Sequence, residues 1–276
     1  MTTRLLLRAI GAALAAGQAI LAVYETDFRV EHKADDSPLT QADRESHRIL
    51  VAQLRPTELP IMSEEGRHLN FEQRRGWHRF WLLDPLDGTK EFIKRNGEFT
   101  VNAALIEGRR PIAGVVYAPV PDILYIGSRD QGAFKIVSAQ EKWHSVQNET
   151  QDLESRFQDL LRRSVRLPST SAEPKRFTIV GSRSHGGPEL EAIVDRKRAE
   201  HGDVDFISAG SSLKLCLVAE GRAHLYPRTG PTMEWDTAAG QAVAEAGGAE
   251  VVDFETGRPL RYNKEDLHNP WFLVKR

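Results

Sequence analysis

The stretch WLLDPLDGTKEF, residues 81–92, joins a strand-like apolar run to two acidic residues and a helix start. Asp84 and Asp87 follow the apolar run, and Gly88 and Thr89 open the predicted helix. Two carboxylates held this close repel each other, and burial increases the cost, so a hard divalent cation would stabilise the pair. Free backbone N–H groups at a helix start suit a phosphate. The stretch therefore predicts a metal-dependent phosphoryl hydrolase.

The composition is that of a soluble globular protein of one large domain or two joined ones. The chain has 276 residues, of which 40% are hydrophobic and 28% charged. Its net charge of −2 gives no electrostatic reason to expect binding to a nucleic-acid polymer. The single cysteine, Cys216, excludes an internal disulfide and fits a reducing compartment. We therefore expect a cytoplasmic protein with a small-molecule substrate.

The N-terminal segment, residues 5–24, is rich in alanine and has two interpretations. Arg4 and Arg8 accompany an apolar run, as they would in a secretory signal. Gly11 and Gly17 interrupt the run, which is also short for a membrane span, so a first helix of the fold is favoured. We expect no transmembrane segment, and peripheral attachment of this helix to the inner membrane stays open.

Strand and helix patterns interleave along the chain, with hairpins in the first half, which favours a layered α/β or α+β fold. Residues 66–78 lack apolar periodicity and are expected to form a loop. The polar stretch 139–175 is the expected boundary or insertion, which divides the chain into halves 1–138 and 139–276. The patterns predict helices over residues 5–24, 41–55, 88–95, 188–201, 212–220 and 235–247, and strands over 80–83, 99–106, 112–118, 123–127, 132–136, 177–180, 205–208, 223–226, 251–252 and 271–274.

Two further acidic segments stand at the ends of predicted elements. Glu64 and Glu65 follow an apolar strand end, and Asp236 precedes an alanine-rich helix. Taken alone, the glutamates predict a solvated turn and Asp236 a helix N-cap. Together with the pair in residues 84–87, they supply the oxygen ligands that a metal site requires.

Two motifs in this order resemble the paired signature of a known superfamily. DPLDGT at 84–89 and WDTAAG at 235–240 are similar to those of the lithium-sensitive, Mg²⁺-dependent phosphatases of the inositol monophosphatase superfamily. KADDSPLTQAD at 33–43 and LPIMSEE at 59–65 bring the resemblance closer to the bacterial 3′(2′),5′-bisphosphate nucleotidase branch. It runs from about residue 5 to the C-terminus. The implied fold is a layered α-β-α-β-α sandwich of the inositol monophosphatase/fructose bisphosphatase type.

The resemblance also implies roles for the site residues. Gly88 and Thr89 would bind the phosphate through N–H groups, and Thr89 with Asp43 would orient and deprotonate the attacking water. Asp43 has the alternative of capping the second helix. Two or three Mg²⁺ ions are implied, with Li⁺ as an inhibitor. The implied ligands are Glu64, Asp84 and the Leu86 carbonyl for one ion, and Asp84, Asp87 and Asp236 for another.

Substrate choice is expected to come from the second half of the chain. The resemblance assigns His185, Ser211, Lys214 and Arg228 to a nucleotide's second phosphate, ribose and base. Ser211 could instead cap a helix, and Lys214 and Arg228 could be surface charges. The expected reaction removes the 3′-phosphate of adenosine 3′,5′-bisphosphate to give AMP, with 3′-phosphoadenosine 5′-phosphosulfate as a second substrate. Alternatives are an inositol monophosphatase, a sugar bisphosphatase, or a non-catalytic nucleotide or metal sensor.

Overall fold

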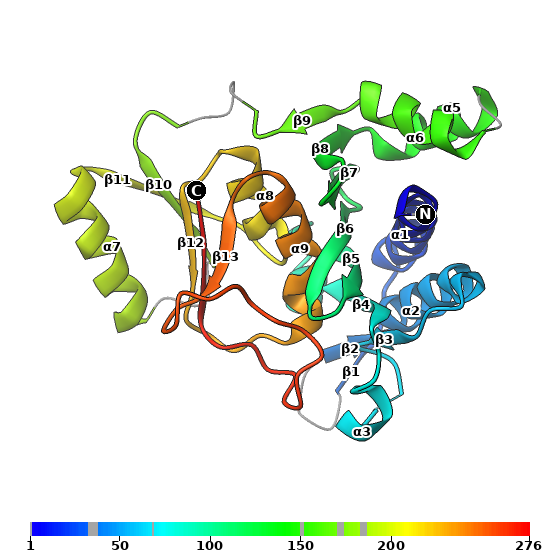
Figure 1. Cartoon of the computed structure of the whole chain (residues 1–276), viewed down its shortest axis with the longest axis horizontal. Coiled ribbons are helices and arrows are strands. Elements are labelled where there is room, and N and C mark those ends of the chain that lie inside the picture. The colour runs from blue at the N-terminus through cyan, green and yellow to red at the C-terminus, as the bar shows by residue number, and fades with distance from the viewer. Residues whose placement is uncertain (1, 33–37, 68, 150–151, 170–173, 183–186) are drawn as a thin grey trace.

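The computed structural model describes residues 2–32, 38–67, 69–149, 152–169, 174–182 and 187–276. Two sheets and three helical layers alternate in the order α-β-α-β-α, which confirms the expected sandwich (Figure 1). The two halves expected from the sequence remain a prediction. The structure adds that a strand from the polar stretch after residue 138 pairs into the first sheet.

The larger sheet has seven strands in the order β3-β4-β5-β6-β7-β8-β9. Only the β3–β4 pair is parallel within the part of this sheet that the structure describes. The strands are β3 (Ile61–Ser63), β4 (Arg79–Asp87), β5 (Thr100–Glu107), β6 (Arg110–Ala118), β7 (Ile123–Ser128), β8 (Gly132–Val137) and β9 (Val165–Leu167).

The smaller sheet has five strands in the order β11-β10-β12-β14-β13. Its members are β10 (Phe177–Gly181), β11 (Val204–Ser208), β12 (Leu225–Arg228), β13 (Glu250–Asp253) and β14 (Phe272–Lys275). A separate antiparallel pair, β1 (Val30–His32) and β2 (Pro38–Thr40), precedes the second helix. The sequence patterns did not predict this pair, because it is too short to show an alternation.

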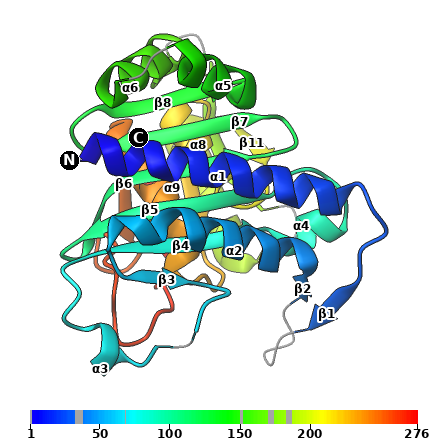
Figure 2. The same cartoon turned by 90° about the vertical axis from the view of Figure 1, so that its right-hand side faces the viewer.

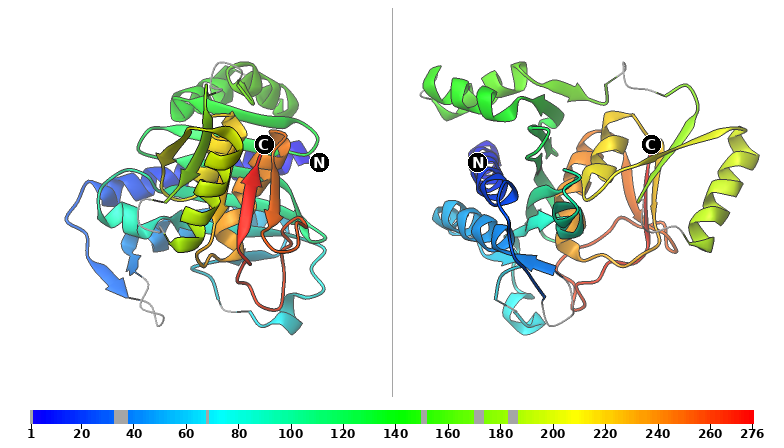
Figure 3. Two further views of the ribbon diagram at one scale, coloured as in Figure 1. Left: turned by 90° about the vertical axis from the view of Figure 1, so that its left-hand side faces the viewer. Right: turned by 180° about the vertical axis from the view of Figure 1, so that it is seen from behind.

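Each helical layer covers a defined sheet face. Helices α1 (Thr2–Tyr24) and α2 (Gln41–Leu54) cross the outer face of the larger sheet (Figure 2). Helices α8 (Leu213–Glu220) and α9 (Glu234–Ala246) fill the space between the sheets. Helix α7 (Pro188–His201, yellow-green) covers the outer face of the smaller sheet (Figure 3, left).

Close packing fixes the position of α9. A Cβ added at Gly114 of β6 would lie 2.5 Å from the Ala239 oxygen, so the helix backbone rests directly on the strand. The inward residues of α9, including Ala238 and Val243, are fully buried. Because any larger residue at this contact would push the helix away, the start of α9 is held in a defined place above the sheet.

The apolar N-terminal segment belongs to the fold as α1. It is the one helix among the described residues with the length and hydropathy to cross a membrane, but 61% of its apolar window is buried. Its inward residues, such as Ile10 and Leu14, contact the core beneath it. Packing against the sheet and α2 therefore accounts for its apolar character.

The prediction of a loop over residues 66–78 is wrong in one part, because this segment contains the one-turn helix α3 (Phe71–Arg74). A capping box between Asn70 and Gln73 specifies this turn, and a single turn is too short to show apolar periodicity. The polar stretch after residue 138 contains α5 (Ala139–Glu149) and α6 (Leu153–Arg162) before β9. The short elements α4 (Thr89–Ile93) and the 3₁₀ turn η1 (Arg55–Thr57) complete the described fold.

Candidate active site

A β-bulge brings Asp84 and Asp87 to the same side of β4. Asp84 pairs with Asn102 of β5 and Asp87 pairs with Thr100. Between these two pairs the chain advances by three residues in β4 but by only two in β5, so β4 contains one extra residue. Without the extra residue, side chains three positions apart would point to opposite faces of the sheet. Pro85 lies inside the bulge, where the missing N–H costs no ladder hydrogen bond.

Glu64 joins this pair from the neighbouring strand. Its backbone N–H donates to the Leu83 oxygen over 3.1 Å, which continues the parallel pairing of β3 and β4 one residue beyond the end of β3. One carboxylate oxygen from each of Glu64, Asp84 and Asp236 lies within 4.8 Å of the others. Burial, and then the nearby charge of Glu64, raise the pKa of Asp84 well above its ordinary value. A carboxylate cluster that resists ionisation in this way fits a hard divalent cation.

Asp236 reaches the cluster from the first turn of α9. It is not the N-cap, because Met233 occupies that position and donates its N–H to the Asp236 carboxylate over 2.9 Å. Packing around the carboxylate, and then the charge of Asp87, raise its pKa well above the ordinary value. The third acidic segment therefore meets the other two as expected.

Asp43 and Thr89 lie beside the cluster and contact each other. The Thr89 hydroxyl donates to Asp43 Oδ1 over 3.3 Å, and the Leu86 oxygen is 3.4 Å from the same hydroxyl. Asp43 Oδ2 accepts from the N–H of Thr40, the N-cap of α2, over 2.7 Å. The capping alternative for Asp43 is thus confirmed, and the same carboxylate also contacts Thr89.

The turn between β4 and α4 arranges the remaining backbone groups. The Leu86 N–H donates to Asp84 Oδ1 over 3.1 Å. Gly88 adopts a left-handed conformation, φ 93°, as the N-cap of α4, which a residue with a Cβ rarely adopts. The turn therefore ties Leu86 to Asp84 through its N–H and to the Thr89 hydroxyl through its carbonyl.

A cavity of about 120 Å³ opens next to these residues. Three predicted substrate residues, Ser211, Lys214 and Arg228, line it together with Asp87 and Asp236. Residues predicted to bind metal and residues predicted to bind substrate therefore line the same cavity. The further lining residues are Gly88, Glu91, Ser182, Leu215, Tyr226, Thr232, Thr237 and Phe272. His185, the fourth predicted substrate residue, lies outside the described residues.

Lys214 is a buried cation at this cavity. Its side chain is only 5% exposed, and its ammonium donates to the Ser211 oxygen over 2.7 Å and to the Ala209 oxygen over 3.3 Å. Burial lowers the pKa of Lys214 to about 8, and the opposing pull of Asp87 does not offset it. The surface-charge alternative is therefore wrong for Lys214.

Ser211 and Arg228 differ in how the structure holds them. Ser211 adopts a positive φ of 46°, and its buried hydroxyl has no hydrogen-bond partner within the described part of the chain. The N-cap position of α8 belongs to Ser212, so the capping alternative for Ser211 is wrong. The Arg228 guanidinium donates to the oxygens of Gly230 and Pro231, which fixes it at the cavity wall.

The sequence analysis missed Asn102, which ties together segments of the site. Its side-chain amide donates to Asp87 Oδ2 over 3.2 Å and to the Ser212 hydroxyl over 2.9 Å. Ser212 in turn donates to the Asp236 backbone oxygen over 2.7 Å. The available signal was a buried polar residue inside the apolar run of β5.

A second buried network holds the start of α9. Glu234 is fully buried, and its carboxylate accepts from the Asn263 and Lys264 N–H groups and from the Lys264 ammonium. Arg74 of α3, 2% exposed, donates to Asn263 Oδ1 and to the oxygens of Lys264 and Glu265. The loop that follows Glu64 and the helix that carries Asp236 are therefore connected through residues 263–265.

Residues 2–271 match the model of the inositol monophosphatase family. The chain belongs to the inositol monophosphatase family. This family is Mg²⁺-dependent, in agreement with the acidic cluster.

Within this family the chain is similar to proteins named 3′(2′),5′-bisphosphate nucleotidase CysQ. The protein from Escherichia coli strain K12 is 45% identical over 264 residues, which cover 94% of each chain. That from Haemophilus influenzae is 31% identical over 94% of this chain and 87% of its own. The crystal structure of CysQ from Bacteroides thetaiotaomicron aligns with a TM-score of 0.86 and 49% identity over 97% of this chain and 95% of that one.

Proposed function

We propose that this family member is a Mg²⁺-dependent phosphatase that removes the 3′-phosphate of adenosine 3′,5′-bisphosphate to give AMP and phosphate. The observation that carries the proposal is the cavity lined by Asp236, a member of the acidic cluster, and by Asp87, together with the cations Lys214 and Arg228. A substrate with two phosphates needs one site for the reacting group and another for the group that is retained. The names of the CysQ relatives support the same activity.

The cluster of Glu64, Asp84 and Asp236 is suited to Mg²⁺, with Asp87 and the Leu86 carbonyl completing the proposed ligands. Bound there, Mg²⁺ would neutralise charge on the phosphoryl group and increase the acidity of coordinated water. The proposal includes two or three ions and competition by Li⁺ for one position.

Thr89 and Asp43 form the proposed proton acceptor. Because the Thr89 hydroxyl donates to Asp43, its oxygen lone pairs remain able to accept a hydrogen bond from a water molecule. The water's proton can pass to Thr89 as the Thr89 proton passes to Asp43. Asp43 is held in place by its bonds to Thr40. The Gly88 and Thr89 amides at the start of the α4 turn bind the phosphoryl oxygens in this scheme.

The 5′-phosphate is assigned to Ser211, Lys214 and Arg228. A charged ammonium, a guanidinium and an unpaired hydroxyl offer complementary donors to a phosphate. The assigned contribution of His185 also belongs to this part of the proposal. The sulfated analogue, 3′-phosphoadenosine 5′-phosphosulfate, presents oxygens in the same place and is included as a second substrate.

The nearest alternatives are an inositol monophosphatase and a sugar bisphosphatase of the same superfamily. An inositol monophosphate has no second anionic group for Lys214 and Arg228 to bind, so the lining of this cavity disfavours it as the substrate. The non-catalytic sensor is disfavoured by the contact of Thr89 with Asp43, since a sensor has no use for a proton acceptor.

A cytoplasmic location is part of the proposal. The free cysteine, Cys216, fits a reducing compartment. Peripheral membrane attachment has less support, because the apolar face of α1 packs against the core.

The test follows the product by phosphorus NMR. Adenosine 3′,5′-bisphosphate incubated with the protein and Mg²⁺ should give AMP, with the 5′-phosphate resonance retained. Formation of adenosine 3′-phosphate would reverse the assignment of the two phosphate positions. Lys214→Met with Arg228→Met should raise KM much more than it lowers kcat, and an equal loss with inositol 1-phosphate would reject the second-phosphate site.

A further inference from the structure

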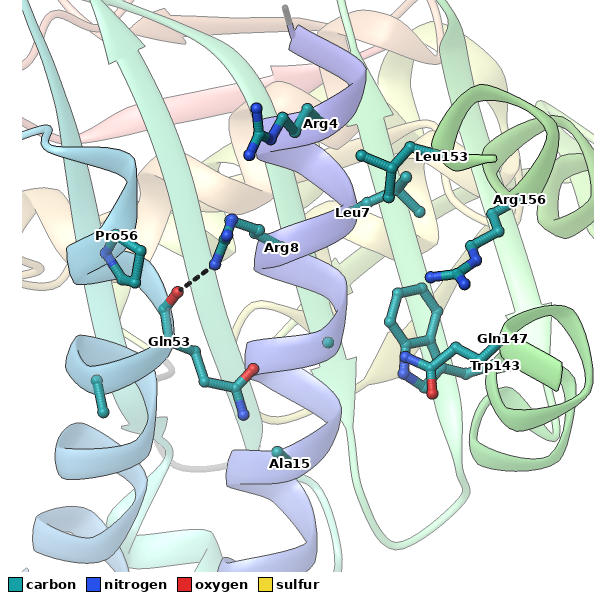
Figure 4. A pocket seen from close by; sticks show the side chains of 12 residues that line it. Arg4, Leu7, Arg8, Ala15, Gln53, Pro56, Trp143, Gln147, Leu153 and Arg156 are labelled. Carbon is teal, nitrogen blue, oxygen red and sulfur yellow. Dashed lines mark hydrogen bonds between the residues drawn. The ribbon is translucent and has the colours of Figure 1, made fainter. Parts of the chain in front are cut away.

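A second cavity, of about 560 Å³, lies on the outer helical layer. It runs over α1 between the C-terminal end of α2 on one side and α5 and α6 on the other (Figure 4). None of the residues that line it also lines the active-site cavity. It lies on the face of the larger sheet opposite to α9, so a ligand bound here would not touch the acidic cluster.

The floor of this groove is apolar. Leu7, Gly11 and Ala15 lie one turn apart along one face of α1 and form the floor. The indole of Trp143 stands against it, because a Cβ added at Gly11 would be 3.1 Å from the ring. On α6, Leu153 is 42% exposed although it borders the groove. A flat apolar part of a ligand could pack against these side chains.

The rim of the groove is positively charged. Arg4 and Arg8 lie along one side of α1, and Arg156 of α6 lies on the other side (Figure 4). No acidic side chain among the described residues lines the groove. Arg8 donates to the Gln53 oxygen over 3.5 Å, and within the described residues neither Arg4 nor Arg8 pairs with a carboxylate. Three cations thus gather here on a protein whose net charge is −2.

We propose that this groove binds a small soluble organic anion, made of an aromatic or short aliphatic body and one phosphate, sulfonate or carboxylate group. The body packs on Gly11, Ala15 and Trp143, and the anionic group is attracted by Arg8 and Arg156, which lie on opposite sides of α1 (Figure 4). Guanidinium groups suit this role because they donate two parallel hydrogen bonds to such an anion. The volume lies in the range of small-molecule sites. A recessed floor between raised walls fits a small molecule better than a membrane surface.

The test is a titration of the whole protein with 8-anilinonaphthalene-1-sulfonate, which carries one anionic group on an aromatic body. Fluorescence and calorimetry should give one saturable site per chain. Arg8→Gln and Arg156→Gln should each weaken binding by about tenfold, and Ala15→Trp should abolish it by filling the floor. Arg48→Gln and Arg198→Gln, which remove exposed arginines outside the groove, are the matched controls and should change the affinity less than about twofold.

Three results would overturn the proposal. Equal weakening by the control substitutions would mean attraction by overall charge alone. Displacement of the dye by adenosine 3′,5′-bisphosphate would place it in the active site. Binding of the protein to phosphatidylglycerol vesicles with the same dependence on Arg8, together with no saturable dye binding, would assign the groove to a membrane. Circular dichroism and unchanged phosphate release confirm that each variant is folded, and the dye titration does not depend on the proposed enzymatic function.

Discussion

Replacing Lys214 should remove a pH-dependent part of substrate affinity. Burial lowers the pKa of Lys214 to about 8. With a pKa of 8, about 90% of Lys214 is charged at pH 7 and about 10% at pH 9. Because only the charged form attracts the second phosphate strongly, kcat/KM for adenosine 3′,5′-bisphosphate should fall as the pH rises through 8.

The size of the expected loss in kcat/KM follows from one charge-assisted hydrogen bond between Lys214 and the phosphate, which contributes about 1.5–3 kcal/mol. At pH 7 the ratio of kcat/KM between the wild type and Lys214→Met should therefore be about 10–150. At pH 9 the charged fraction is about tenfold smaller, and the ratio should shrink in proportion. Taking the ratio at each pH removes the titration of every group that the two proteins share.

The assay is initial-rate phosphate release at saturating Mg²⁺ between pH 6.5 and 9.5. Lys214→Arg is the matched control, because arginine keeps its charge over this range and should give a ratio to Lys214→Met that does not shrink. If the ratio of kcat/KM between the wild type and Lys214→Met stays constant from pH 7 to pH 9, a buried, titrating lysine does not bind the substrate.

Three further predictions concern the acidic cluster and its supports. Asp84→Asn should abolish turnover. Because burial raises the pKa of Asp84 in the folded protein, ionising this carboxyl costs stability, so wild-type stability in EDTA should fall as the pH rises above the ordinary aspartate pKa of about 4, and the variant should show a smaller slope. Thermal melts in EDTA measure this, and parallel slopes would contradict it. Thr89→Val and Asp43→Asn should each lower kcat by about 10²–10⁴-fold in steady-state assays. The Mg²⁺ concentration needed for half-maximal activity should change little. A large change in that concentration would mean that these residues position the metal instead. Glu234→Ala should lower the free energy of unfolding, measured in urea, by about 2–5 kcal/mol, because it leaves buried N–H groups and the Lys264 ammonium unpaired. A decrease below about 0.5 kcal/mol would show that this network does not stabilise α9.

The layers of the fold and the meeting of the acidic segments were predictable from the sequence. Alternating and helical patterns are long in this chain, and Asp84 and Asp87 are too close in sequence to be separated widely in space. The bulge that turns both to one side was not predicted, because it depends on the register between β4 and β5. For Asp84 and Asp87, proximity followed from the chain, but their orientation required the partner strand.

The supports of the site were harder to predict than the site itself. Asn102 contacts Asp87, 15 positions away, and Ser212, 110 positions away, and the partners of Glu234 lie 29–30 positions away. Sequence reasoning can mark a polar residue in an apolar strand as unusual, but it cannot name the partner that satisfies it. Lys214 is a similar case, since its burial depends on how α8 packs between the sheets. The isolated turn of α3 required only its capping box, a local signal that could have been used.

The most direct measurement is phosphate release from adenosine 3′,5′-bisphosphate and inositol 1-phosphate side by side, with Mg²⁺, with EDTA, and with Mg²⁺ plus Li⁺. The account predicts fast release from the nucleotide that EDTA abolishes and Li⁺ inhibits, and slow release from inositol 1-phosphate. Equal or faster release from inositol 1-phosphate would contradict the assignment of Ser211, Lys214 and Arg228 to a second phosphate. Release that persists in EDTA would contradict the metal role of Glu64, Asp84 and Asp236.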